Sequence, residues 1–203
     1  YPNNTLYVGP WIMSADNSIA AASFHEFPIT SQNSSGWTKT WSNQDATYLI
    51  QGELFYPGDF DGDGKADLIW SNMVTGERSM WFQNGSSTIG GTTLNTIPVA
   101  WVISAVGDFN GDGKADVFLT NTVNGDRALW LMSSSSIVTN AFMGTVPVDW
   151  SINGTGDFNG DGKKELVWSN TSTGDRAMWL LSGSTVTGGG YLGTVPVEWK
   201  INN

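Results

Sequence analysis

Short runs of bulky apolar residues recur along the chain at a fixed interval of 49 residues. Each run contains a β-branched residue and follows an acidic, glycine-rich stretch, which is typical of a loop that leads into a strand rather than into a helix. A period of this length, kept without insertion or deletion, indicates an array of repeated supersecondary units. The runs are Leu68–Trp70, Val117–Leu119 and Leu166–Trp168.

The second unit carries the signals of four strands. A strand is predicted at residues 115–121, and an Asn-Gly turn, a strong hairpin signal, separates it from a second strand at 127–132. A third strand is predicted at 136–146, and a fourth begins at 150–152 and returns toward the next acidic loop. Four strands in roughly 40–50 residues are typical of one blade of a β-propeller.

The first part of the chain carries a divergent copy of this unit. Its sequence Trp-Ile-Met-Ser at 11–14 parallels Trp-Leu-Met-Ser at 130–133, and in every copy a proline follows that tryptophan by 17 residues. We therefore predict a repeat at residues 6–29 that begins at its second strand. The next acidic loop then arrives 21 residues late, after an insertion that holds Trp37 and Trp41.

These units predict one all-β domain, a β-propeller of four-stranded blades. Because open sheet edges promote aggregation, we expect the blades to close into a ring. Two closures stay open: an extra strand at residues 46–54 completes a four-bladed ring in a monomer, which we favour, or two chains associate into a larger ring. The predicted parts of the domain 1–203 are a divergent blade with its insertion at 1–57 and regular blades at 58–106, 107–155 and 156–203.

The acidic stretch before each apolar run has the chemistry of a calcium site. Counted from the first Asp, side-chain oxygens occupy positions 1, 3, 5 and 9, a glycine at position 6 allows a sharp turn, and the lysine at position 7 offers its backbone carbonyl. Such alternating oxygens converge on one point, as Ca²⁺ requires from about six to eight ligands. The predicted ligands are Asp59, Asp61, Asp63, Lys65 and Asp67 in the first loop, Asp108, Asn110, Asp112, Lys114 and Asp116 in the second, and Asp157, Asn159, Asp161, Lys163 and Glu165 in the third.

An EF-hand loop begins in the same way but needs a carboxylate at position 12 and flanking helices. Here position 12 is Trp70, Leu119 or Trp168, inside the apolar runs, so the EF-hand interpretation is rejected. Carboxylates packed this closely would repel one another without a cation. We therefore expect three Ca²⁺ ions per chain, and the tightest binding in the first loop, where position 3 is Asp61 instead of an asparagine.

Three features together resemble the FG-GAP or VCBS repeat of integrin-like β-propellers: the Gly-Asp-Phe-Asp/Asn-Gly-Asp-Gly-Lys loop, the Thr/Asn-Gly-Asp/Glu-Arg turn and the later Trp. The resemblance covers about residues 58–203. It implies that each repeat forms a four-stranded blade with Ca²⁺ in the loop between two strands. It also implies a link to sugars, because bacterial and fungal propeller lectins similar to this repeat place shallow sugar pockets between adjacent blades.

Several recurring side chains are candidates for packing or for ligand binding. Trp81, Trp130 and Trp179 are expected to wedge between blades. The recurring asparagines suit either a turn cap or a ligand contact. The recurring arginines suit either an ion pair, with the preceding acid or with a loop carboxylate, or hydrogen bonds to sugar hydroxyls. The candidates for a ligand-binding surface are Trp101, Trp150, Trp199, Asn72, Asn121, Asn170, Arg78, Arg127 and Arg176.

The composition narrows the range of functions. No cysteine is present, and the single histidine, His25, excludes a repeated histidine-based site, so we expect no enzyme. The net charge is −10 without any basic patch, which disfavours a nucleic-acid partner. No apolar run reaches the roughly 18–20 residues that span a bilayer, so no membrane insertion is expected. The low charged fraction of 14% is typical of a secreted, extracellular β-rich protein.

We therefore expect a secreted, calcium-stabilised propeller that binds a glycan or polysaccharide without catalysis, as a lectin or carbohydrate-binding module. The alternatives are a protein-interaction or cell-adhesion propeller, or an accessory domain of a polysaccharide-degrading enzyme.

Overall fold

The computed structural model describes residues 58–199, together with the strand backbones at 5–8, 11–13, 19–22, 25–28 and 37–39. The chain divides into two compact units, Tyr1–Gly36 and Trp37–Asn203. All the regular elements among the described residues are β-strands, so the predicted all-β class is confirmed. In this described part, no helix is long and apolar enough to cross a membrane.

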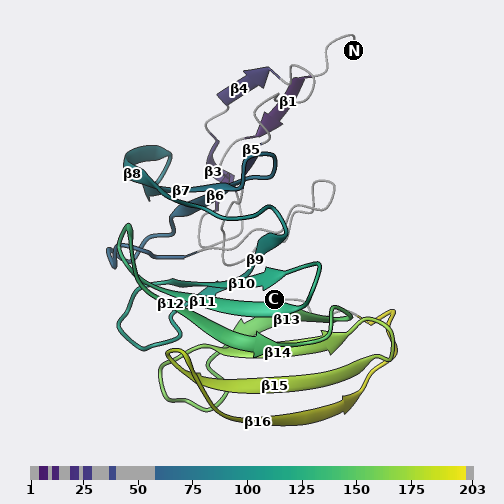
Figure 1. Ribbon diagram of the computed structural model, residues 1–203. Helices are drawn as coiled ribbons and strands as arrows, with labels where there is room; N and C mark the ends of the chain where they lie inside the picture. The colour runs from purple at the N-terminus through teal and green to yellow at the C-terminus, as the bar shows by residue number, and fades with distance from the viewer. Residues whose placement is uncertain are drawn as a thin grey trace. The chain divides into compact units, whose positions relative to one another are not determined.

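The larger unit contains three antiparallel sheets of four strands each, and in every sheet the strands pair in the order in which they occur in the sequence. The second and third sheets lie stacked one on the other (Figure 1). The strands are β5 (Trp37–Lys39), β6 (Leu68–Asn72), β7 (Glu77–Asn84) and β8 (Ser87–Thr96) in the first sheet, β9 (Trp101–Gly107), β10 (Asp116–Asn121), β11 (Asp126–Ser133) and β12 (Ser136–Thr145) in the second, and β13 (Trp150–Gly156), β14 (Glu165–Asn170), β15 (Asp175–Ser182) and β16 (Thr185–Thr194) in the third.

Each sheet begins one strand earlier than the sequence units do. The strand at Trp150, expected to complete the second unit, pairs instead with β14 of the third sheet, where Trp150 lies opposite Asn170. The physical reason is that the acidic loop joins two strands that are hydrogen-bonded to each other. The strand before the loop and the strand after it therefore belong to the same sheet.

The same pairing assigns a place to Trp37. In the first sheet Trp37 lies opposite Asn72, as Trp101 lies opposite Asn121 in the second. Trp37 therefore begins a regular strand, and the rest of the insertion lies between that strand and the first acidic loop. The extra strand expected at residues 46–54 lies outside the described residues.

Alternating side chains give the second sheet a core on both faces. Val117 and Leu119 pack in one cluster with residues of the first sheet, among them Ile69. Phe118, which lies between them in the sequence, packs in a second cluster with Trp168 of the third sheet. The apolar runs that follow the acidic loops are therefore the central strands of a stack of sheets.

The smaller unit contains two strand pairs. In the first pair Tyr7 lies opposite Glu26, and in the second sheet Asp126 lies opposite Thr145, at the same offset that aligns the Trp-Ile-Met-Ser and Trp-Leu-Met-Ser segments. The register of this pair agrees with a divergent copy of the β11–β12 hairpin, whereas the other pair is shifted by one residue, with Trp11 opposite Ala22 and Trp130 opposite Asn140. The single domain over 1–203 stays a prediction. The pairs are β1 (Thr5–Val8) with β4 (His25–Pro28), and β2 (Trp11–Met13) with β3 (Ile19–Ala22).

The three tryptophans expected to wedge between blades differ in their surroundings. Trp130 is only 1% exposed, inside the core between the first two sheets. Trp179 packs against the core between the second and third sheets, with its ring centroid 4.8 Å from that of Trp168. Trp81 is 44% exposed, and its ring centroid lies 4.7 Å from that of Trp70.

The burial of Trp130 predicts a large cost for its truncation. Trp130→Ala should lower the free energy of unfolding by roughly 3–5 kcal/mol, because it opens a cavity between two sheets. Trp199→Ala is the matched control, since Trp199 is 66% exposed and should lose little. Urea denaturation measures both, and equal losses in the two variants would contradict the packing of Trp130.

Candidate metal centres

Each acidic loop is curled around the carboxylate of its first Asp. In the first loop, Asp59 Oδ1 accepts hydrogen bonds from the backbone N–H groups of Gly62 (2.7 Å) and Asp63 (3.1 Å), and Oδ2 accepts one from Gly64 (2.8 Å). Asp108 and Asp157 accept the corresponding three bonds in their own loops. The Asp at position 1 therefore stabilises the loop conformation in addition to offering carboxylate oxygens to a cation.

Glycine is required at two positions of the loop by the backbone. Gly62 at position 4 and Gly64 at position 6 both have φ of 83°, a conformation that side chains with Cβ rarely adopt. A Cβ at Gly64 would meet nothing within 4 Å, so conformation rather than space demands glycine there. The sequence prediction included position 6 and missed position 4, although glycine occupies position 4 in all three loops.

The acid at position 9 is buried and ties the loop to the sheet. Asp116 is 0% exposed; its Oδ2 accepts from Phe109 N in the loop (3.0 Å) and its Oδ1 from Met132 N in β11 (2.8 Å). Asp67 makes the same two links in the first repeat. The longer Glu165 bonds Phe158 N in its loop (2.7 Å), and its other oxygen accepts from Asn159 Nδ2 (3.3 Å).

The first loop brings three carboxylates together. Oxygens of Asp59, Asp61 and Asp67 all lie within 4.8 Å of one another. Two oxygens bound to one Ca²⁺ at about 2.3–2.6 Å can be at most about 5.2 Å apart, so these three fit around a single ion. The other loops present an amide oxygen at position 3: Asn110 Oδ1 and Asn159 Oδ1 each accept from the backbone N–H two residues ahead (both 2.8 Å).

The side chains at positions 5 and 7 pair with each other in the first and third loops. Asp63 is not part of the three-carboxylate group; it accepts from Lys65 N (2.9 Å) and forms an ion pair with the Lys65 ammonium. Lys163 Nζ likewise lies 3.3 Å from Asp161. The ammonium group at position 7 therefore contacts the position-5 carboxylate in these two loops.

The pKa shifts in the loops differ between buried and exposed acids. Burial raises the pKa of Asp116 to about 7, and the neighbouring Asp112 and Asp108 carboxylates add to the increase. Burial also raises the pKa of Asp67. At the exposed rim, the hydrogen bond from the Lys65 side chain lowers the pKa of Asp63. A cation bound beside the buried carboxylates would favour their charged form.

Neighbouring loops are joined by backbone hydrogen bonds. Ala115 N in the second loop donates to the carbonyl of Asp59 in the first (2.7 Å), and Lys164 N in the third donates to that of Asp108 (2.8 Å). Gly58 lies at the same junction, where a Cβ would come within 2.7 Å of the Ala115 Cβ. The three loops therefore form a continuous row at one end of the stacked sheets.

The asparagines proposed as ligand contacts cap turns. Asn72 Oδ1 accepts from the backbone N–H groups of Val74 and Thr75, both at 3.0 Å. Asn121 and Asn170 accept from the corresponding turn residues of their repeats. Turn capping was one of the two roles that the sequence left open.

The arginines lie in the interior, and two of them link consecutive sheets. Arg78 is 0% exposed, Arg127 1% and Arg176 8%. Each donates from Nη2 to the backbone carbonyl of the tryptophan 23 residues ahead, and for Arg78 and Arg127 that tryptophan begins the first strand of the next sheet. These tryptophans are Trp101, Trp150 and Trp199, of which the first two are half-buried.

The acids that precede the arginines have hydroxyl partners, which sequence reasoning missed. Thr93 donates to Glu77 (3.1 Å) and Thr145 donates to Asp126 (2.6 Å) across the β7–β8 and β11–β12 pairs. Asp175 accepts from Thr194 (2.6 Å) in the same way. The recurrence of threonine or tyrosine on the last strand of each sheet is the signal that points to these bonds.

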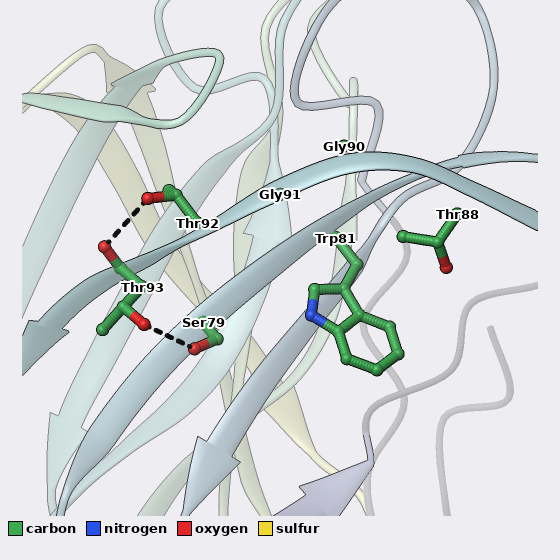
Figure 2. A pocket seen from close by; sticks show the side chains of 7 residues that line it. All are labelled: Ser79, Trp81, Thr88, Gly90, Gly91, Thr92 and Thr93. Atoms are coloured by element: carbon green, nitrogen blue, oxygen red, sulfur yellow. Dashed lines mark hydrogen bonds between the residues drawn. The ribbon is translucent and has the colours of Figure 1, made fainter.

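A shallow hollow of about 350 Å³ lies on the first sheet, beside the exposed Trp81. Figure 2 shows its indole beneath β8, with the hydroxyl-bearing side chains to either side. A Cβ at Gly91 would lie 3.0 Å from Trp81 Cδ1, so glycine leaves room over the ring. The lining residues are Ser79, Trp81, Thr88, Gly90, Gly91, Thr92 and Thr93.

A family model for the FG-GAP-like repeat matches residues 59–119 and 108–168, which together span more than half of the chain. The chain therefore belongs to the FG-GAP-like repeat family, as the loop motif predicted. Each match runs from the first Asp of one acidic loop to the strand that follows the next loop. A search of curated proteins found no match.

The raised pKa of Asp116 predicts a pH dependence in metal-free buffer. Its pKa is about 7 in the folded chain against 3.8 ordinarily, so between these values the folded state binds the proton more tightly. Stability should therefore fall as pH rises from about 4 to about 7. Asp116→Asn should flatten this slope.

Urea denaturation with EGTA across this pH range measures the effect. The control is Asp149→Asn, a half-buried acid outside the loops, which should keep the slope of the parent chain. Equal slopes in the parent and in Asp116→Asn would contradict the assignment to Asp116.

Proposed function

We propose that this protein is a calcium-stabilised, non-catalytic β-propeller that recognises carbohydrate outside the cell. Membership of the FG-GAP-like repeat family supports a propeller-type interaction domain. The observation that carries the calcium proposal is the convergence of oxygens from Asp59, Asp61 and Asp67 within 4.8 Å. The observation that favours a sugar ligand is the hollow of about 350 Å³ beside the indole of Trp81, which is 44% exposed.

The calcium proposal extends to all three loops because they share one conformation. In each, the first Asp organises the loop through three backbone N–H groups, and a buried acid closes it. The bound ion would supply the positive charge that a buried carboxylate lacks in the protein. Extracellular calcium modules bind with dissociation constants of about 10⁻⁴–10⁻³ M, which fits exposed loops and a secreted protein.

An exposed phenylalanine on the third sheet supports a ring of blades. Phe60 and Phe109 are 0% exposed at the second position of their loops, whereas Phe158 at the same repeat position is 55% exposed. A further blade packed beside the third sheet would bury Phe158 as its equivalents are buried. We keep the four-bladed ring in a monomer as the favoured closure, with a ring completed by a second chain as the alternative.

The sugar proposal rests on the chemistry of the Trp81 hollow. An indole ring suits the apolar C–H face of a pyranose, and the exposed Thr88 hydroxyl, which accepts from Gln83 Nε2 (2.9 Å), can donate to a sugar oxygen.

We expect calorimetry to count three Ca²⁺ ions per chain and chelation to lower the melting temperature markedly. A ligand bound only to the folded state stabilises it by about 2.7 kcal/mol per site at a hundredfold excess over its dissociation constant. Asp61→Asn gives the first loop the amide found at position 3 of the others and should weaken that site to their level. Asp59→Ala should abolish Ca²⁺ binding at the first loop.

Asp149→Asn, at a half-buried acid outside the loops, is the control and should keep all three ions. No binding heat at millimolar calcium, together with an unchanged melting temperature in EDTA, would remove calcium from the proposal.

A glycan array followed by calorimetry tests the sugar proposal. Trp81→Ala should abolish binding to any glycan that scores on the array, while calcium occupancy stays intact. Phe142→Ala removes another exposed aromatic ring, 66% accessible, and is the matched control. If no glycan binds at millimolar concentration, the carbohydrate proposal fails and a protein-interaction or adhesion module replaces it.

A further inference from the structure

The end of the sheets opposite the acidic loops forms a second continuous surface. Because antiparallel strands alternate in direction, the turns after β6, β10 and β14 lie at this end, with the connections that follow β8 and β12. Backbone bonds join them in sequence: Ile97 N donates to Gly76 O (3.0 Å), Thr122 N to Ala100 O (2.8 Å) and Val146 N to Gly125 O (2.9 Å). The same pattern continues through the third sheet.

This surface exposes a row of aliphatic side chains that the packing of the sheets does not use. Three of them recur directly after the repeated proline. We call the set the valine band: Met73 (41% exposed), Val74 (69%), Val99 (46%), Val123 (78%), Val148 (58%), Val195 (37%) and Val197 (42%). Contiguous exposed apolar residues of this kind mark interaction surfaces.

Among residues 58–199, the exposed charges around the valine band have one sign. Within residues 58–199, all four lysines lie in the acidic loops at the other end, and the three arginines are buried. Every acid outside the loops in that range lies beside the valine band. These acids are Glu77, Asp126, Asp149, Asp175 and Glu198.

We propose that the valine band docks a protein partner that presents aliphatic side chains flanked by lysine or arginine. Apolar contact would supply the affinity, and the ring of acids would select a cationic surface. A second copy of this chain would bring acids against acids, and an anionic membrane would be repelled in the same way. The valine band shares no residue with the calcium loops or the Trp81 hollow, so this inference does not rest on either proposal.

The probe is a fluorescent peptide of alternating leucine and lysine, compared with one of alternating leucine and glutamate. Fluorescence anisotropy should show binding of the lysine peptide only, and the affinity should fall between low salt and about 0.15 M salt, where charges are more strongly screened. The double change Val123→Ser with Val148→Ser should weaken binding about tenfold or more. Serine is compatible with this turn, because Ser172 stands at the repeat position of Val74 and Val123.

The matched control is Val138→Ser with Val186→Ser, which removes two valines exposed by 60% and 42% outside the valine band. This pair should bind the lysine peptide as the parent does. Asp149→Asn with Glu198→Gln should weaken binding and reduce its dependence on salt. Melting temperatures of all variants identify any that fail to fold.

Three results would overturn the proposal. One is unchanged peptide binding by the folded Val123→Ser, Val148→Ser variant, and another is an equal loss in the control pair. The third is evidence that the valine band binds something else. Light scattering would then show a dimer of the parent that is lost in the Val123→Ser, Val148→Ser variant, or the parent would bind phosphatidylserine vesicles and the variant would not.

Discussion

A buried carboxylate at the end of each acidic loop holds this structure together locally. Asp116 accepts one hydrogen bond from its own loop and one from β11, so a single side chain fixes the loop against the sheet. The cost is electrostatic, because burial raises its pKa to about 7 while two further carboxylates stand nearby. The loop, the sheet and the proposed cation therefore stabilise one another. An uncompensated negative charge on Asp116 would weaken the attachment of the loop to the strand.

The repeat is nearly uniform in sequence but not in environment. Trp130 and Trp81 occupy the same repeat position, yet one is sealed between two sheets and the other is 44% exposed. Phe109 and Phe158 differ in the same way. The exposure of each side chain depends on what packs against its face of the sheet, so equivalent positions of the repeat differ in exposure.

The two ends of the stack differ in chemistry. One end carries the acidic loops together with all the lysines of residues 58–199, and the other carries the valine band and only acids. Strand direction produces this division, because each repeat places its loop at one end and its turn at the other. The arginines are buried: Arg78 and Arg127 join one sheet to the next through the carbonyls of Trp101 and Trp150, and Arg176 donates to the carbonyl of Trp199.

The sequence alone was sufficient for the all-β class, the repeat family and the shape of the acidic loops, since these depend on local spacing of Asp, Gly and apolar residues. It placed the strand at Trp150 in the wrong sheet, because strand pairing across a loop is a long-range choice. It also left the roles of Asn72 and Arg78 open, since a polar side chain in a repeat looks the same whether it caps a turn, crosses a core or faces solvent. Only the tertiary structure decided those roles, through burial and through backbone partners far away in sequence.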